Sequence, residues 1–178
     1  MDLQTLTAIS PLDGRYRKRI DMLSMYASEY GLIKYRVQVE IEWFLFLAQR
    51  DEIEALSNIS KLSTEEIRSI ATNFSVEDAE EIQNIERTTN HDVKAVEYFV
   101  KKKLADLGFS QHKEFVHFAC TSEDINNLSY GLMLKAIRSE VLLPQMDKIT
   151  TYINEMSSSL RNVAMLSRTH GQMASPTT

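Results

Sequence analysis

Cysteine, glycine and proline are scarce in this sequence, which has 1 Cys, 5 Gly and 3 Pro among 178 residues. The single cysteine, Cys120, can form no disulfide within the chain and has no partner at metal-ligand spacing. We therefore expect a reducing compartment and no zinc site. Because so few glycines and prolines leave few places to turn, the elements between them must be long. Long helices fit this shortage better than many short strands.

A basic charge excess and a long apolar run are also missing. The formal net charge is -5, which argues against nucleic-acid binding, where a basic face supplies much of the affinity. The longest apolar run, Trp43–Ala48, falls far short of the ~20 residues that span a bilayer. The first residues, Met1–Gln4, lack the basic region of a signal peptide. We expect a cytoplasmic protein with neither a nucleic-acid nor a membrane partner.

Apolar residues recur three and four positions apart over most of the chain, which is the pattern of amphipathic helices. Ser63 and Ser75 are each followed three residues later by an acid, as at a capped helix start. Pro144 suits the first turn of a helix. The spacing predicts helices over residues 28–50, from 63, from 75, over 92–107, over 122–142 and from 144.

Residues 108–113 form the best internal boundary, because Gly108 supplies a stop for the preceding helix. We expect an all-α fold, with an N-terminal helical domain over residues 1–110 and the first long helices of a helix-bundle domain over 111–178. Helices with so much apolar surface need neighbours, so bundle packing and contact with other subunits are expected. The polar segment from Leu166 to Thr178 shows no capping signal, and the chain looks truncated there.

Four segments concentrate polar side chains, and each has a structural explanation beside a functional one. The basic cluster Arg15–Arg19 could hold a phosphate, because arginine presents a planar fork of donors, or could be a solvated surface. The segment Glu86–Lys94 joins two helices, and Asn90 or Asp92 could serve there only as an N-cap. Its density of titrating groups also suits a site, since sites gather on loops of a rigid scaffold.

The other two segments are centred on helix starts and histidines. Thr121 and Ser122 stand where a long helix begins, so they could cap it or bind an anion at its exposed amides. His117, flanked by apolar residues, could be a hydrogen-bonded core histidine or a catalytic one. His170 lies beside Arg168 in a segment without helical spacing, and imidazole titrates near neutral pH. From the residues alone we predict a soluble all-α protein whose loops suit anions.

Read together, these segments resemble the adenylosuccinate lyases of the bacterial type, a family within the fumarase and aspartase superfamily. The resemblance covers essentially the whole chain, and the run ERTTNHDVKAVEYF is specific to this family within the superfamily. The segments that carry it occur in the family's order: Pro11–Tyr16, Glu86–Ala95, Phe118–Asn127 and Ser167–Gln172.

The resemblance also implies roles for individual residues. His170 matches the family's general acid, and His117 matches a further active-site histidine. Thr121 and Ser122 would bind an anionic group, most simply a succinyl carboxylate. The remaining matched positions are assigned to substrate binding: Arg15 and Tyr16 for the phosphate, and Asn90, His91, Asp92 and Lys94 for the nucleotide, with His91 also a catalytic candidate.

The activity implied by the resemblance is the β-elimination of fumarate from adenylosuccinate and from SAICAR, without a metal or an organic cofactor. The family acts as a homotetramer, and its base is a serine in a downstream Ser-Ser-x-Met-Pro-x-Lys loop. That motif is missing from these 178 residues, so we expect the chain alone to be inactive. Two alternatives remain: another fumarate-releasing lyase, such as argininosuccinate lyase, or a structural protein on the same scaffold, as in some crystallins.

Overall fold

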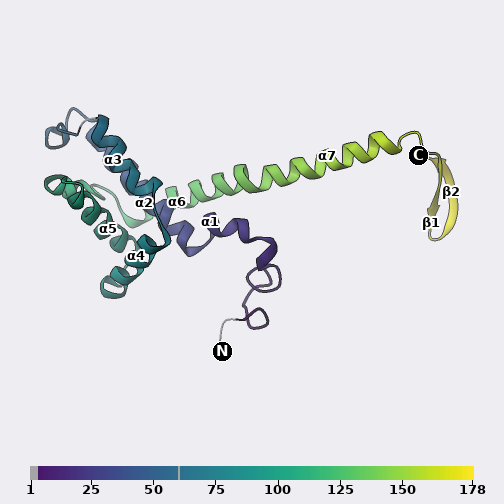
Figure 1. Ribbon diagram of the computed structural model, residues 1–178, viewed down its shortest axis with the longest axis horizontal. Coiled ribbons are helices and arrows are strands. Elements are labelled where there is room, and N and C mark those ends of the chain that lie inside the picture. Colours follow the sequence, from purple (N-terminus) through teal and green to yellow (C-terminus); the bar gives the residue numbers. More distant parts are fainter. Residues whose placement is uncertain (1–3, 60) are drawn as a thin grey trace. The chain divides into compact units, whose positions relative to one another are not determined.

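The computed structural model describes residues 4–59 and 61–178 of the chain (Figure 1). Contacts divide it into two compact units, Met1–Ile137 and Arg138–Thr178, which are described here one at a time. Helices dominate the described residues, and the strands are confined to one short hairpin. The predicted all-α fold class is confirmed. The predicted domain boundary near residue 110 stays a prediction, because the two units describe contacts within this chain alone.

The first unit is a cluster of helices joined by short loops and 3-10 turns. The helices expected over residues 28–50, from 75 and over 92–107 are all present. The helix expected from Ser63 begins earlier, at Lys61, so Ser63 lies inside its first turn. The elements in chain order are η1 Arg17–Arg19, η2 Asp21–Leu23, α1 Ser24–Ala27, α2 Glu29–Ala48, η3 Glu54–Leu56, α3 Lys61–Thr72, α4 Val76–Thr89, α5 Asp92–Asp106, η4 Ser110–Phe115 and α6 Ser122–Ala136.

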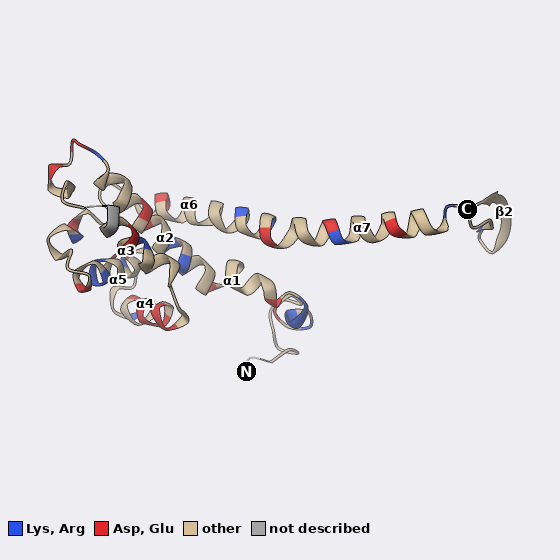
Figure 2. Ribbon diagram, turned by 45° about the horizontal axis from the view of Figure 1, so that its top comes forward, with Lys and Arg blue, Asp and Glu red and all other residues tan. Residues whose placement is uncertain are grey.

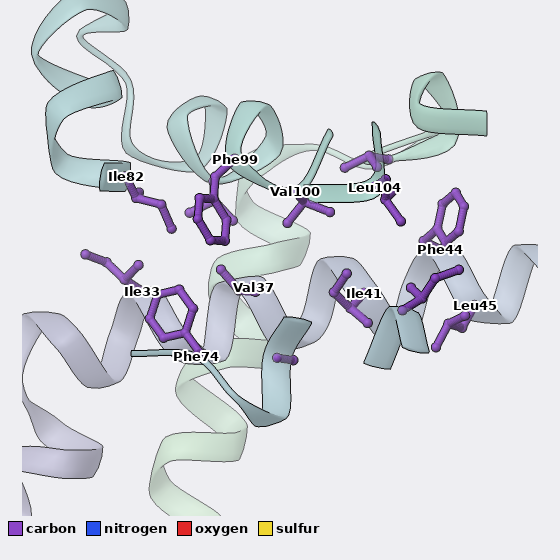
Figure 3. Close-up of a cluster of buried hydrophobic side chains, with 14 of the residues drawn as sticks. Ile33, Val37, Ile41, Phe44, Leu45, Phe74, Ile82, Phe99, Val100 and Leu104 are labelled. Atoms are coloured by element: carbon purple, nitrogen blue, oxygen red, sulfur yellow. The ribbon is translucent and has the colours of Figure 1, made fainter. Parts of the chain in front are cut away.

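Helix α2 forms the centre of this unit, with α3, α5 and α6 packed against it. Its inward residues Ile33, Val37, Ile41 and Phe44 are at most 2% exposed and meet the apolar face of α5 (Figure 3). On another side, Val39 packs with Val93 and Ile125 in a second apolar cluster. A helix that is apolar around so much of its circumference needs neighbours on several sides. This burial fixes the positions from which α2 side chains can reach other elements.

Side-chain caps explain where two of these helices begin. At the start of α4, Ser75 Oγ accepts from the Asp78 N–H at 3.2 Å, and Asp78 Oδ2 accepts from the Ser75 N–H at 3.0 Å. This reciprocal pair satisfies two amides that the helix leaves free, as the sequence predicts. Asp78 Oδ1 also meets Lys103 Nζ at 2.7 Å, which ties the start of α4 to α5.

The second unit contains one long helix and one hairpin. A π-helical stretch, η5 Ile137–Leu142, replaces part of the helix predicted over 122–142, and α7 Leu143–Leu160 follows with Pro144 in its first turn. Large apolar side chains along α7, Ile149 and Ile153 among them, are 37–63% exposed, and charged residues occur only at intervals (Figure 2). Bundle packing stays a prediction. None of the helices in residues 4–59 and 61–178 is long and apolar enough to cross a membrane.

The polar segment at the end of the sequence forms a β-hairpin that helical periodicity could not predict. Strands β1 Met165–Thr169 and β2 Gln172–Thr177 pair in antiparallel register. Ser167 lies at an irregularity in this pairing, where its Oγ donates to the Ser175 carbonyl at 2.8 Å. The hairpin places a two-residue turn, His170–Gly171, at its tip.

Replacing Phe99 by alanine tests the core between α2 and α5. Phe99 is fully buried and meets the Phe74 ring edge-on at 5.9 Å between centroids. Loss of that packing should lower the free energy of unfolding by ~3–5 kcal/mol, measured by urea denaturation. Phe46→Ala is the matched control, because Phe46 is 42% exposed; an equal loss in both variants would contradict this account of the core.

Asp78→Asn tests the capping box and its dependence on pH. Burial raises the pKa of Asp78, but hydrogen bonds from Lys103 and the Ser75 backbone outweigh it, so the pKa lies below its ordinary value. A lowered pKa adds stability above the unfolded-state value of ~3.9, and that stability is lost as pH falls through the folded-state value. The variant should be ~1 kcal/mol less stable at pH 7, with the gap closing toward pH 3 in urea titrations. Asp51→Asn, on an exposed loop, should show no such gap.

Candidate functional site

The connection between α4 and α5 positions the first candidate residues. Helix α4 ends at Asn90, whose φ of 50° is left-handed and whose N–H donates to the Glu86 carbonyl at 2.8 Å. The sequence offered Asn90 or Asp92 as the N-cap of α5, but His91 takes that place: its Nδ1 accepts from the Lys94 N–H at 3.2 Å. Nδ1 is therefore unprotonated, and a neutral His91 carries its proton on Nε2.

The start of α6 lies beside this connection. His91 Nε2 is 3.4 Å from the hydroxyl oxygen of Ser122, the first residue of α6. Asp124 Oδ2 accepts from the Thr121 N–H at 2.8 Å, so the capping role that the sequence allowed for this segment is present. An anion at this helix start would bind Ser122 and other groups rather than the Thr121 amide. Two segments predicted to share a site, residues 86–95 and 118–127, do meet here.

Arg36 of α2, which the sequence analysis did not single out, holds these two segments in place. Its side chain is 5% exposed, and its Nη2 donates to Asp92 Oδ2 at 2.5 Å while Nε donates to Asn126 Oδ1 at 2.9 Å. Burial raises the pKa of Asp92, but the Val93 N–H and the Arg36 charge outweigh it and hold the pKa below its ordinary value. Asp92 therefore stays ionised at neutral pH and keeps its ion pair with Arg36.

A second buried charge on α2, Glu40, contacts another candidate. Glu40 Oε1 lies 2.6 Å from His117 Nδ1, and the carboxyl group is fully buried. Burial raises the pKa of Glu40, against the lowering effect of the hydrogen bond with His117. The backbone of His117 is left-handed, with φ 61°, and Trp43 Nε1 fixes the next peptide by donating to the Phe118 carbonyl at 2.8 Å. His117 is hydrogen-bonded, as expected of a core histidine, yet its side chain is 18% exposed.

Arg36 and Glu40 stand four residues apart, so they lie on one face of α2 in consecutive turns. The connection that bears His91 and the loop that bears His117 are thus each attached to the same helix face. The sequence contains a partial signal for both: Arg36 and Glu40 are charged residues one helical turn apart in a helix rich in apolar residues, although Lys34 and Glu42 of the same helix are charged as well. An apolar groove of about 560 Å³ runs alongside, lined by residues of α2, α6 and the loop at Cys120.

Lys94, Arg15 and Tyr16 are placed less tightly. Lys94 Nζ pairs with Glu97 Oε2 at 2.8 Å and lies 5.3 Å from the Tyr98 ring, while its side chain stays 44% exposed. Arg15 and Tyr16 are exposed and contact each other, at 5.9 Å from guanidinium to ring. Within the described residues, no hydrogen bond or ion pair joins Arg15 or Tyr16 to the connection at His91.

His170 belongs to the second unit, where it forms the hairpin turn with Gly171. Their φ values of 51° and 78° are both positive, as in the type I′ turn that suits the twist of two-residue hairpins. Histidine is among the residues enriched at positive φ, so the His-Gly pair was a usable turn signal. The side chain of His170 is exposed. In the part of the chain that the structure describes, no three His, Cys, Asp or Glu side chains gather as metal ligands would.

Arg36→Met tests whether the buried guanidinium holds the site together. Asp92 would lose its charge partner and Asn126 its donor, so the free energy of unfolding should fall by ~1.5–3 kcal/mol. Arg68→Met is the matched control, because Arg68 makes a half-exposed ion pair with Glu42; its cost should stay below ~1 kcal/mol. Urea denaturation measures the loss of unfolding free energy in both variants. Equal losses would show that Arg36 contributes no more to stability than a surface ion pair.

Known proteins are similar to this chain along the full length of the chain. A family described as "Lyase" matches residues 14–178. The adenylosuccinate lyases of Escherichia coli strain K12 and of Haemophilus influenzae are each 49% identical over 179 residues, and that of Dictyostelium discoideum is 46% identical over 182. Each alignment covers 100% of this chain and 39% of the relative, so the chain spans about two fifths of their length. The chain belongs to the lyase family.

Proposed function

We propose that this chain is part of an adenylosuccinate lyase, which eliminates fumarate from adenylosuccinate to give AMP and from SAICAR to give AICAR. The observation that carries the proposal is the 49% identity to enzymes of that name over 100% of the chain. It is supported by the site, where the segments 86–95 and 118–127 place His91 beside Ser122. The enzyme would act in the cytoplasm, on a small nucleotide, and as a homotetramer.

The reaction requires removal of a proton next to a succinyl carboxylate and protonation of the departing nitrogen. Negative charge develops on the carboxylate in the transition state, so donors aimed at it supply much of the rate. In the proposed site the side chains of Ser122 and Thr121 hold that carboxylate at the start of α6, since the Thr121 amide is already bonded to Asp124. His91 faces the same place with a donor at Nε2, because its Nδ1 is occupied by the Lys94 amide.

The nucleotide would be held by the remaining candidates. Asn90, Asp92 and Lys94 line the connection before α5, and Arg15 with Tyr16 would bind the phosphate from the arm before α2. Asp92 would act as an ionised carboxylate held by Arg36. It would orient neighbouring donors and would not change its charge near neutral pH. These assignments need residues from several parts of the protein to come together, as in a homotetramer.

His170 is proposed as the general acid. An imidazole can protonate a leaving nitrogen at neutral pH because its pKa lies near the working pH. Its place in a tight turn fixes its backbone, and its exposed side chain leaves the ring accessible to a ligand. The base of the family, a serine in a Ser-Ser-x-Met-Pro-x-Lys loop, has no counterpart among these 178 residues, so the proposed reaction also needs residues from outside this chain.

His170→Ala in the full-length protein tests the acid. Fumarate release from adenylosuccinate should fall ~10²–10⁴-fold in kcat, while adenylosuccinate binding, followed by calorimetry, should change little. Asp51→Asn is a control for handling and folding. Normal turnover by His170→Ala would overturn the assigned role. Wild-type turnover of argininosuccinate instead of adenylosuccinate would replace the proposed substrate, and a folded wild-type protein inactive on both would favour a structural role.

A further inference from the structure

The buried position of Glu40 on α2 is unfavourable for the stability of the fold. Its carboxyl group is fully buried, and its Oε2 has no hydrogen-bond partner among residues 4–59 and 61–178. A buried polar atom without a partner is destabilising, and an apolar residue of similar size in place of a buried charge is often neutral or stabilising. Packing alone therefore does not account for a glutamate at this position.

The backbone of His117 is also unusual. Its φ of 61° is a left-handed conformation, which is uncommon for residues other than glycine although histidine is among those enriched there. This backbone is held on both sides, by the buried Val116 before it and by the Trp43 bond to the Phe118 carbonyl after it. The loop thus fixes the imidazole so that Nδ1 reaches Glu40 at 2.6 Å.

The two histidines on the α2 face differ in the role of Nδ1. In His91, Nδ1 accepts from a backbone amide, which can only donate, so Nε2 bears the proton. In His117, Nδ1 meets the Glu40 carboxyl group. An ionised carboxylate can only accept, and with it Nδ1 bears the proton and Nε2 of the neutral ring is free to accept. No described residue bonds to His117 Nε2, and the ring is partly exposed.

We propose that Glu40 is a positioning residue for His117: by accepting from Nδ1–H it fixes the tautomer and leaves Nε2 as a proton acceptor facing the ligand. The ligand group would be an O–H or N–H donor of the nucleotide substrate, complementary to the Nε2–H that His91 presents. This role rests on the proposed function for its substrate, but the contact between Glu40 and His117 rests on the geometry alone.

Other charged groups face this pair and bear on its pH dependence. From α5, Glu97 lies near enough to disfavour a second negative charge on Glu40, but it is itself paired with Lys94 and Lys101 at 2.8 and 3.1 Å. From the loop, the thiol of Cys120 has its pKa raised by burial first and then by the charges of Glu40 and Asp124. On α2, Arg36 lies one turn away and is paired with Asp92. His117 is thus the one cation-forming group in hydrogen-bond contact with Glu40 in the described chain.

The experiment uses the full-length protein with Glu40→Gln, which keeps the shape and the acceptor oxygen but removes the charge. Exchange of the imidazole Cε1 hydrogen, read by mass spectrometry at each histidine, reports on the His117 ring without reference to activity. Its rate at a fixed pH should differ between the Glu40→Gln variant and the wild type, and the acid limb of the kcat/KM profile should move as well. kcat should fall ~10–100-fold, with KM changed less. Glu42→Gln, on the exposed side of the same helix, is the control.

Each outcome decides the proposal. An unchanged His117 exchange rate and an unchanged pH profile in a folded Glu40→Gln variant would overturn it. Glu40→Asp is the second variant, should the glutamine protein fail to fold: it keeps the charge but shortens the reach, so kcat should fall and normal kcat would overturn the proposal. A changed His117 exchange rate in a protein that never turns over adenylosuccinate would sustain the positioning role of Glu40 and reject the proposed function instead.

Discussion

The buried guanidinium of Arg36 is the contact on which the candidate site depends. It bonds to Asp92 and to Asn126 and so joins the starts of α5 and α6, whose apolar residues Val93 and Ile125 also pack together with Val39. A guanidinium can do this because its donors are fixed in one plane and always charged. With both starts held, His91 and Ser122 lie within reach of each other. The polar geometry is therefore set from inside the core rather than by the loops themselves.

This arrangement places two demands on one helix. Helix α2 supplies the central apolar face of the first unit, through residues such as Val37 and Phe44, and the charged anchors Arg36 and Glu40. Burial of its apolar residues holds α2 rigidly in place, and this rigidity fixes the positions of the Arg36 and Glu40 side chains. The cost is two desolvated charged groups, and Oε2 of Glu40 has no hydrogen-bond partner among the described residues. Locally destabilising features that are held in place by a rigid core are common at functional sites.

Local signals in the sequence were enough for the helices and for one cap. Periodic apolar spacing predicted α2, α4 and α5, and the Ser75–Asp78 pair predicted a helix start that the structure confirms. The N-cap of α5 could not be chosen from sequence, because Asn90, His91 and Asp92 all compete for it. The anchors were missed because the partners of Arg36 and Glu40 lie 56–90 residues away. The hairpin was missed because its strands are polar and lack the alternation that marks a half-buried strand.

The exposed apolar side of α7 has a consequence for the way such a protein is made. Every residue of the main core cluster lies between Ile33 and Val116, so the first unit has all of its core partners before α7 leaves the ribosome. Domains tend to fold as units in the order of their synthesis. The exposed side chains of α7, such as Tyr152 and Ile153, take no part in that core, so the core of the first unit can form while α7 is still being synthesised.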